Sequence, residues 1–302
     1  MHLNKIFFLG GFLFLGLFLS AQQNEMSEIS YAEDSLAQLF DSLYAFNDIR
    51  YIRNDAEKNA INKQIVRIFN RILYYKQSFS YPFSKLKKLS VLSDKRVRIY
   101  VWDTQLDDHS HVYHAFLQYR PNKRKFLVYQ LHDYSDSITN PLFLKLKPET
   151  WYGCLYYQMI TKKYRGKYYY TLIGWDGNNL LTSKKIIDVL TFTASGKPRF
   201  GKKIFMLKQR KRPARIIYEF SAKTTMVIHY DAQRDTLFLD HLSPSKPEYR
   251  GLYQFYGPDF SYDGLYFQKG KWYIDEDIKP HNEKQKGTKG TTRPMRSIYN
   301  PK

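Results

Sequence analysis

Carboxylates, amides and aromatic rings occur together in two short stretches of the sequence. One is Trp175-Asp176-Gly177-Asn178, which follows a run of tyrosines, and the other is GPDFSYDG over residues 257–264. Two carboxyl groups can serve as general acid and general base in glycoside hydrolysis, and aromatic rings can stack on a sugar. The candidate catalytic residues are Asp176, Asp259 and Asp263. The candidate ligand-binding residues are Trp175, Asn178, Phe260 and Tyr262.

Both stretches also have the composition of ordinary turns. Asp and Asn favour turns through local backbone hydrogen bonds, and Pro258 and Gly264 suit a structural loop. On this interpretation Trp175 packs at the end of a strand and Asp176-Gly177 makes the turn. The Asp176 stretch lacks the spaced oxygen donors and distal Glu of a calcium-binding helix-loop-helix, which excludes that loop type.

The histidines give weaker indications of chemistry. His109 and His111 would share one strand face and His114 would lie on the other, and their spacing matches no standard zinc site. Asp240 and His241 are neighbours on a strand and face opposite ways, which disfavours a dyad between them. We therefore expect no metal and no cofactor.

Basic residues alternate with tyrosines in KKYRGKYYY, residues 162–170. Such a cluster could hold an acidic polymer by charge and stacking, and a basic hairpin tip is the ordinary alternative. The whole chain has a formal net charge of +20. This charge favours an anionic partner or merely keeps an aromatic-rich protein dispersed, and composition does not distinguish the two.

The N-terminus predicts a signal peptide over residues 1–21. MHLNK precedes an uncharged apolar run over 6–19, and Ser20-Ala21-Gln22 offers a cleavage site after Ala21. The run is shorter than the roughly 20 residues that span a bilayer, and no second long apolar run follows. We therefore expect a soluble exported protein with no transmembrane segment after cleavage, either periplasmic or extracellular. Cleavage removes Lys5 and leaves a net charge of +19.

Export narrows the partners of so basic a protein. It favours lipopolysaccharide, anionic lipid surfaces, acidic glycans or another envelope protein, and it disfavours nucleic acid. Cys154 is the only cysteine, so no intrachain disulfide can form. It lies among aromatic residues, as a small buried apolar group does.

Two amphipathic helices are predicted after the signal peptide. Ser30 to Glu33 has the pattern of a capping box ahead of an apolar stripe, which predicts a helix over 31–46. Asn54 to Glu57 repeats the pattern, which predicts a second helix over 55–76. Residues 22–90 should therefore form a helical hairpin and a connector.

From residue 96 the pattern changes to about a dozen short β-rich runs separated by turn residues. The predicted strands cover 96–103, 111–119, 125–132, 151–161, 167–175, 184–193, 202–208, 214–221, 224–231, 235–242 and 251–257, with DGLYFQ and KWYIDE closing the series. We predict a mainly β protein whose large antiparallel β-meander over 91–278 forms a barrel or a sandwich. Residues 279–302 are polar and basic and should form a disordered tail.

Alternating strands would also separate the loops by charge. If neighbouring strands run in opposite directions, alternate turns lie at opposite ends of the sheet. One end would collect acidic turns, such as those at Asp107, Asp176 and Asp231 to Asp235. The other would collect basic turns, such as those at Lys123 and Arg165.

Characteristic stretches of the β region are GWDGNN, KKIIDVLTF with FGKKIF after it, FLDHLSP, and FYGPDFSYDGLYF ahead of KWYIDEDI. They resemble stretches that recur in uncharacterised exported proteins of Bacteroidota, a family with no assigned activity. The resemblance covers about 97–278 and implies export and a shared β-rich body. It transfers no catalytic residue to this chain.

The sequence thus favours an exported binding or structural protein of the cell envelope that recognises an anionic glycan or a lipid surface. The alternative is a carbohydrate-active hydrolase that uses loop carboxylates. Whether the protein is an enzyme stays open at this point. The two alternatives differ in whether the carboxylates meet in one cleft.

Overall fold

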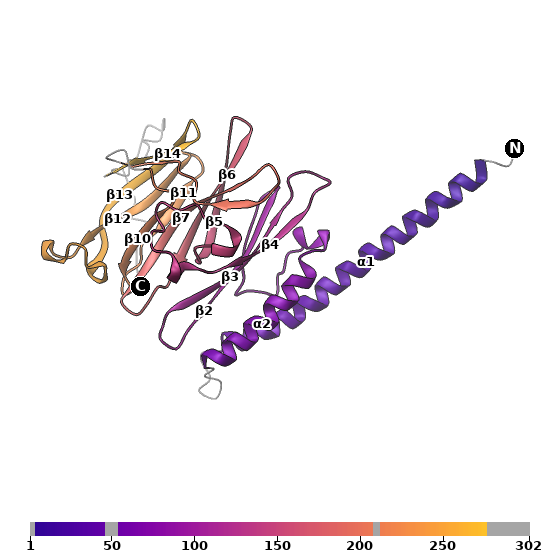
Figure 1. Ribbon diagram of the computed structural model, residues 1–302, viewed down its shortest axis with the longest axis horizontal. Helices are drawn as coiled ribbons and strands as arrows, with labels where there is room; N and C mark the ends of the chain where they lie inside the picture. Colours follow the sequence, from indigo (N-terminus) through magenta and orange to yellow (C-terminus); the bar gives the residue numbers. More distant parts are fainter. Residues whose placement is uncertain (1–3, 46–53, 208–211, 277–302) are drawn as a thin grey trace, which may run out of the picture.

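The chain folds as four stacked layers. The structure is a computed structural model that describes residues 4–45, 54–207 and 212–276, with the side chains of the first helix from residue 23 onward. Two helices cover one face of a first sheet, which packs on a central sheet, which packs on a third (Figure 1). None of the sheets closes on itself in the described part of the chain. The predicted mainly β fold with two preceding helices is confirmed, in its sandwich-like form.

Helix α1, Asn4–Leu43, is longer than the helix predicted over 31–46. The predicted start at Ser30 is wrong, because no Gly or Pro between Gln22 and Ser30 ends the preceding helix. Within the described residues, no helix combines the length and the apolarity that crossing a membrane requires. Cleavage after Ala21 stays a prediction, and the predicted tail over 279–302 lies outside the described residues.

Glu33 has a tertiary role in place of the predicted cap. Its side chain is buried and accepts hydrogen bonds from the Tyr81 hydroxyl (2.7 Å) and from the backbone N–H of Lys85 (2.8 Å). A buried carboxylate is tolerated only when such donors replace its hydration. Glu33 therefore ties α1 to the connector that follows the second helix.

Helix α2, Asp55–Ile72, begins where the sequence predicts it. The side chain of Asn54 accepts a hydrogen bond from the Glu57 N–H (3.0 Å), and the Glu57 carboxylate accepts one from the Asn54 N–H (3.1 Å). This reciprocal pair satisfies two backbone donors that the first helical turn leaves free. The helix ends before residue 76, and a short 3-10 helix, η2 (Lys76–Phe79), follows.

Replacing Asn54 with Ala should lower the free energy of unfolding by about 1 kcal/mol, because it removes the acceptor for the Glu57 N–H. Urea unfolding followed by circular dichroism measures the change. Asn54→Ser is the matched control, since serine can also accept this hydrogen bond. Equal stability of the Ala and Ser variants would show that the cap contributes nothing.

The two helices bury their apolar stripes on the outer face of the first sheet. The rings of Phe69 and Trp102 lie 5.5 Å apart, and Phe40 meets Trp102 edge to face at 5.8 Å. The Trp102 indole N–H donates to the Asn62 side chain (2.9 Å), so this buried ring also satisfies its polar atom. The helical hairpin is therefore part of the core.

The first sheet contains four antiparallel strands in sequence order. They are β1 (Ser90–Ser93), β2 (Val97–Gln105), β3 (His111–Tyr119) and β4 (Leu127–His132). Strand β1 was not predicted: it begins at Ser90, the last residue of the predicted connector, and ends before the first predicted strand at residue 96. The inner face of the sheet meets the central sheet through a core that includes Val97, Ile99 and Val101.

The central sheet has the order β10-β7-β6-β5. Strand β10 pairs with residues 182–187 of β7, and the short strand β8 pairs with residues 190–192 of the same strand. Its strands are β5 (Leu155–Tyr164), β6 (Lys167–Asp176), β7 (Thr182–Phe192), β8 (Pro198–Phe200) and β10 (Ile216–Ser221). One face contributes Leu172 to the first core, and the other contributes Ile173 to the second. Because both faces are covered, its strands are apolar on both sides.

The third sheet has the order β11-β12-β13-β14-β9. Its strands are β9 (Phe205–Met206), β11 (Ile228–Asp231), β12 (Thr236–Pro244), β13 (Tyr256–Gln268) and β14 (Lys271–Asp275). All its pairings are antiparallel except that of β9 with β14. The buried indole of Trp272 donates to the Thr171 hydroxyl (2.9 Å) and joins this sheet to the central one.

Two predicted strands are corrected. The segment 251–257 contains a short helix, η7 (Tyr253–Phe255), and only its last two residues belong to β13. The segment 202–208 contributes only the two residues of β9. Three further short helices lie in connections, η3 (Ser135–Ser137), η4 (Pro148–Thr150) and η6 (Pro247–Tyr249).

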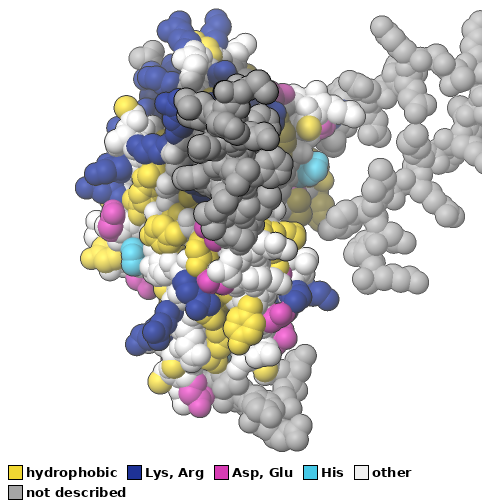
Figure 2. Space-filling view, turned by 90° about the vertical axis from the view of Figure 1, so that its right-hand side faces the viewer, with side chains coloured by type: hydrophobic (Ala, Val, Ile, Leu, Met, Phe, Trp, Pro, Cys, Tyr) yellow, Lys and Arg dark blue, Asp and Glu magenta, His cyan; other side chains and the backbone are white. Residues whose placement is uncertain are grey.

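The predicted separation of charge is wrong in the third sheet. Strands β8 and β10 both run antiparallel to β7, so the alternation of strand directions shifts by one after β8. The turn from Asp231 to Asp235 therefore lies at the basic end, where Asp235 forms an ion pair with Lys162. Lys and Arg side chains still gather at the upper end of the face seen in Figure 2.

Candidate functional site

The predicted site residue Asp176 lies buried between the first and the central sheet. It ends β6, and its Oδ1 accepts hydrogen bonds from the Tyr113 hydroxyl (3.0 Å) and the Asn178 N–H (2.8 Å). The Tyr113 oxygen in turn accepts from the Gly177 N–H (2.8 Å). Burial and the neighbouring Asp176 carboxylate raise the pKa of Tyr113. These contacts attach the turn to the first sheet and occupy the carboxylate.

Trp175 and Asn178 belong to the same turn structure. The Trp175 ring meets the His111 ring edge to face at 5.2 Å, and His111 Nδ1 lies 2.9 Å from the Asp103 carboxylate. A Cβ atom on Gly177 would lie 2.3 Å from His111 Nε2, so any larger residue here would have to displace the His111 ring. The Asn178 side chain donates to the Thr182 hydroxyl (2.6 Å) and accepts from the Lys184 ammonium (2.6 Å). The polar groups of the turn are engaged with one another.

The second predicted stretch, 257–264, lies within strand β13 and is not a loop. Asp240 pairs with Tyr262, whereas Leu242 pairs with Pro258, so residues 259–261 bulge out opposite His241. The Asp259 carboxylate accepts hydrogen bonds from the Ser261 N–H (3.1 Å) and hydroxyl (2.7 Å). Phe260, at the bulge, has a φ of 68° and is 93% exposed. A bulky side chain in this backbone conformation is uncommon.

Asp263 pairs with His241, a contact that the sequence interpretation did not predict. Its Oδ2 lies 3.0 Å from His241 Nδ1, and Asp263 is buried while His241 is 40% exposed at its side chain. Burial alone would lower the pKa of His241, but the hydrogen bond and charge of Asp263 outweigh it and raise that pKa. Asp240 and His241 do face opposite sides of their strand, as predicted from the sequence. The partner of His241 is Asp263, which lies on the neighbouring strand β13. Only the register of β12 and β13 could have shown it.

The three candidate carboxylates do not meet at one place. Asp259 and Asp263 both lie close enough to His241 for their charges to affect it. Asp176 contacts Tyr113 of the first sheet, whereas Asp263 contacts His241 of the third sheet. The central sheet lies between those two sheets. A site that combines Asp176 with the other two carboxylates is therefore not formed.

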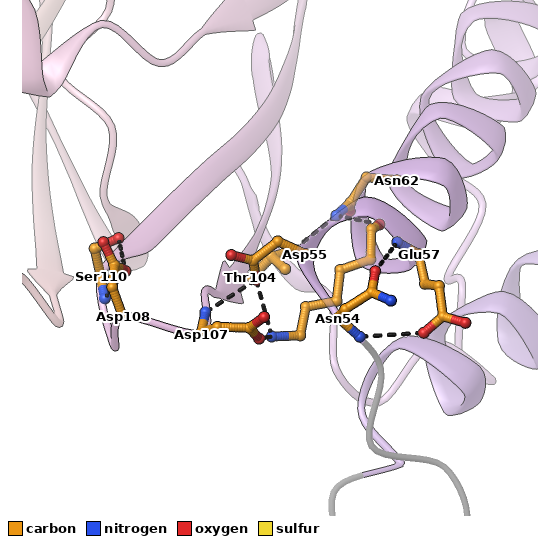
Figure 3. Close-up of polar contacts among 9 residues, drawn as sticks. Asn54, Asp55, Glu57, Asn62, Thr104, Asp107, Asp108 and Ser110 are labelled. Carbon is orange, nitrogen blue, oxygen red and sulfur yellow. Dashed lines mark hydrogen bonds and ion pairs between the residues drawn. The ribbon is translucent and has the colours of Figure 1, made fainter.

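The acidic turn between β2 and β3 anchors helix α2. Lys58 on α2 reaches Asp107 (2.7 Å) and Asp55 (3.2 Å). The Asp107 N–H donates to Asp55 (2.9 Å), and Figure 3 shows these two residues side by side. Asp108 accepts hydrogen bonds from the Ser110 N–H and hydroxyl. These carboxylates therefore have structural partners from the helix and the turn.

The histidines of the predicted loop point to different partners. His111 lies beside Asp103, and the His114 ring stacks on Trp102 at 5.2 Å. Within residues 4–45, 54–207 and 212–276, no group of three or more His, Cys, Asp and Glu side chains has the arrangement of a metal site. Cys154 is buried, and burial raises the pKa of its thiol, which disfavours the reactive thiolate.

A groove at the basic end has the composition that the sequence interpretation attributed to polymer binding. We call it the basic–tyrosine groove; its volume is about 490 Å³, and it lies between residues of the first and central sheets. Its cationic residues are Arg96, Lys167 and Lys202, and no carboxylate is among the residues that line it. Tyr119 and Tyr168 contribute aromatic surface. The groove therefore offers positive charge and flat rings with no carboxylate in its lining.

The rings of the groove are already arranged with cations. The Arg96 guanidinium lies 4.5 Å from the centre of the Tyr168 ring, and the Lys163 ammonium lies 5.3 Å from it. A neighbouring pocket of about 300 Å³ shares Lys202 with the groove and adds Lys145 and Arg199. Cation–π contacts orient these side chains in the unbound protein, which reduces the entropy lost on binding.

No protein-family model, curated protein or solved structure matches this chain. The resemblance to exported proteins of Bacteroidota therefore stays a prediction. The basic–tyrosine groove has the clearest complementarity to a ligand class.

Proposed function

We propose that this protein is an exported binding protein that holds an anionic glycan, such as the acidic saccharide part of lipopolysaccharide, in the basic–tyrosine groove. The observation that carries the proposal is a groove with three cations, several tyrosines and no carboxylate in its lining. Charged groups of one sign in a concave site attract a ligand of the opposite sign. Tyrosine rings can add stacking contacts with the sugar rings of such a polymer.

Export fits the way in which α1 packs. The described core residues of α1 begin at Ile29 and continue through Leu36 and Phe40. Cleavage after Ala21 would therefore leave every one of these contacts in place. A mature protein that starts at Gln22 keeps the helical layer that covers the first sheet.

The hydrolase alternative has less support from the arrangement of carboxylates. Without Asp176 it would rest on Asp259 and Asp263, which are engaged by Ser261 and His241 respectively. Neither carboxylate lines the basic–tyrosine groove. A catalytic pair needs a cleft that admits the sugar between its two carboxyl groups. We therefore favour binding over hydrolysis.

A triple variant tests the proposed site. Arg96→Gln, Lys167→Gln and Lys202→Gln together should weaken binding of polygalacturonate, a polymer of an acidic sugar, by about tenfold or more at low salt, because three attractive charges are removed. Binding of the unaltered protein should also weaken as sodium chloride is raised. Isothermal titration calorimetry measures both effects, with neutral dextran as the uncharged polymer.

The matched control is Arg67→Gln, Lys87→Gln and Lys223→Gln, which removes the same charge from exposed positions outside the groove. This control should bind polygalacturonate nearly as well as the unaltered protein. Equal loss in the two triple variants would show that net charge, and not the groove, captures the polymer. Binding of dextran as tight as that of polygalacturonate would also contradict the proposal.

A further inference from the structure

The outer face of the third sheet presents aromatic side chains to solvent. Leu237, Leu239 and Leu265 point toward the central sheet, so the residues that alternate with them point away from it. Phe238 is paired with Gly264, and Tyr262 is the next outward residue along β13. Because Gly264 has no side chain, the surface is recessed at this position, beside the rings of Phe238 and Tyr262.

A pocket of about 300 Å³ lies on the same face, and we call it the third-sheet pocket. Its apolar walls include Val227, Phe238 and Tyr262. Val227 is 50% exposed, so the pocket is accessible from solvent. Small-molecule sites range upward from about 300 Å³, so this pocket has room for a ligand with one ring and not for a ligand with several rings.

Charged and polar side chains lie around the apolar walls. One oxygen of Asp240 accepts a hydrogen bond from the Val227 N–H (2.8 Å), and Asp240 also lines the pocket. Arg234 places its guanidinium 5.9 Å from the centre of the Phe238 ring and 3.8 Å from the Asp231 carboxylate. His229 completes the polar rim. The pocket thus offers acceptors and donors beside aromatic surface.

We infer that the third-sheet pocket binds a single neutral sugar ring. The C–H face of a pyranose can pack on Phe238 or Tyr262, while its hydroxyls donate to Asp240 and accept from Arg234. This ligand class differs from that of the basic–tyrosine groove, and the inference does not depend on the proposed function.

The lining argues against the other small ligands. An anion would meet two carboxylates, Asp231 and Asp240, whereas the groove at the basic end contains none. A purely apolar ligand would bury these charged groups without replacing their hydration, which is costly. A polyhydroxyl ring satisfies both the aromatic walls and the charged rim.

Nuclear magnetic resonance titration with D-glucose, D-galactose, D-mannose and N-acetyl-D-glucosamine tests the inference. At least one of these sugars should bind with a Kd of about 1 mM or somewhat weaker. The titration is made in about 0.5 M sodium chloride, because salt screens charges and does not weaken the binding of a neutral ligand. Phe238→Ala and, separately, Asp240→Asn should each weaken that binding about tenfold. The triple variant of the basic–tyrosine groove should bind the sugar unchanged, which separates this test from that of the proposed function.

Two features keep the test decisive. Asp240→Asn retains an oxygen that can accept from the Val227 N–H, so it should fold even if Phe238→Ala does not. Tyr273→Ala removes a ring from the same face outside the pocket lining and should leave binding intact. Absence of binding for all four sugars would overturn the inference. Binding that survives both pocket variants would overturn it too.

Discussion

Replacing Asp188 with Asn should lower the free energy of unfolding by about 3–5 kcal/mol, because it leaves the buried guanidinium of Arg215 without its counter-charge. Both side chains are fully buried, and Arg215 Nε lies 2.9 Å from Asp188 Oδ2. The other oxygen, Oδ1, accepts hydrogen bonds from the backbone N–H groups of Val189 (2.6 Å) and Gly201 (2.8 Å). Urea unfolding followed by tryptophan fluorescence measures the loss.

The position of this ion pair explains the size of the expected effect. Asp188 lies on β7 in the middle of the central sheet, where water cannot replace a lost partner. Arg215 also donates to the carbonyl of Pro141, so it fastens the long β4–β5 connection to the start of β10. An amide at position 188 would turn an N–H donor or a neutral oxygen toward the guanidinium, and either loses the charge-assisted bond.

A double variant separates charge from shape. Asp188→Leu with Arg215→Met removes both charges, so it should be clearly more stable than Asp188→Leu alone. If the double variant is as unstable as the two single losses added together, the cost arises from packing and backbone contacts. A loss below about 1 kcal/mol for Asp188→Asn would show that the pair is solvated or dispensable.

The sequence predicted correctly those elements whose signals lie within their own residues. The strand predicted over 111–119 coincides with β3, because a run of β-favouring residues bounded by turn residues is a property of the local sequence. The start of α2 at Asn54 was also predictable, because a capping box is made by residues three apart. The same pattern at Ser30 misled, because a cap forms only where the preceding residues leave the helix.

The candidate sites depended on contacts that no local pattern contains. The bulge at residues 259–261 and the His241–Asp263 pair follow from the register of β12 against β13. The burial of Asp176 follows from the packing of Tyr113 across two sheets. The basic–tyrosine groove was indicated in part by KKYRGKYYY, which supplies Lys167 and Tyr168, whereas Arg96 and Lys202 come from distant segments.

Acidification provides a test of how the helices pack on the first sheet. Burial lowers the pKa of His114 to about 4, compared with 6.5 for an ordinary histidine. Between these two values the unfolded chain binds a proton that the folded chain does not, so this contribution to stability is complete above pH 6.5 and is lost as the pH falls toward 4. The loss should reach at most about 3 kcal/mol, since His114 keeps part of its surface exposed.

His114→Phe should remove this acid dependence while keeping a ring against Trp102, whose centre lies 5.2 Å from that of His114. The quantity to compare is the difference in unfolding free energy between the variant and the unaltered protein at pH 7 and pH 4.5. His241 works in the opposite direction: its pKa is raised, so its contribution is present at low pH and is lost as the pH rises through that raised value. The two histidines are therefore separable, because only the His114 variant should gain relative stability on acidification. A difference that stays constant between the two pH values would mean that His114 can be protonated within the folded protein, and that the layer between α2 and the first sheet admits water.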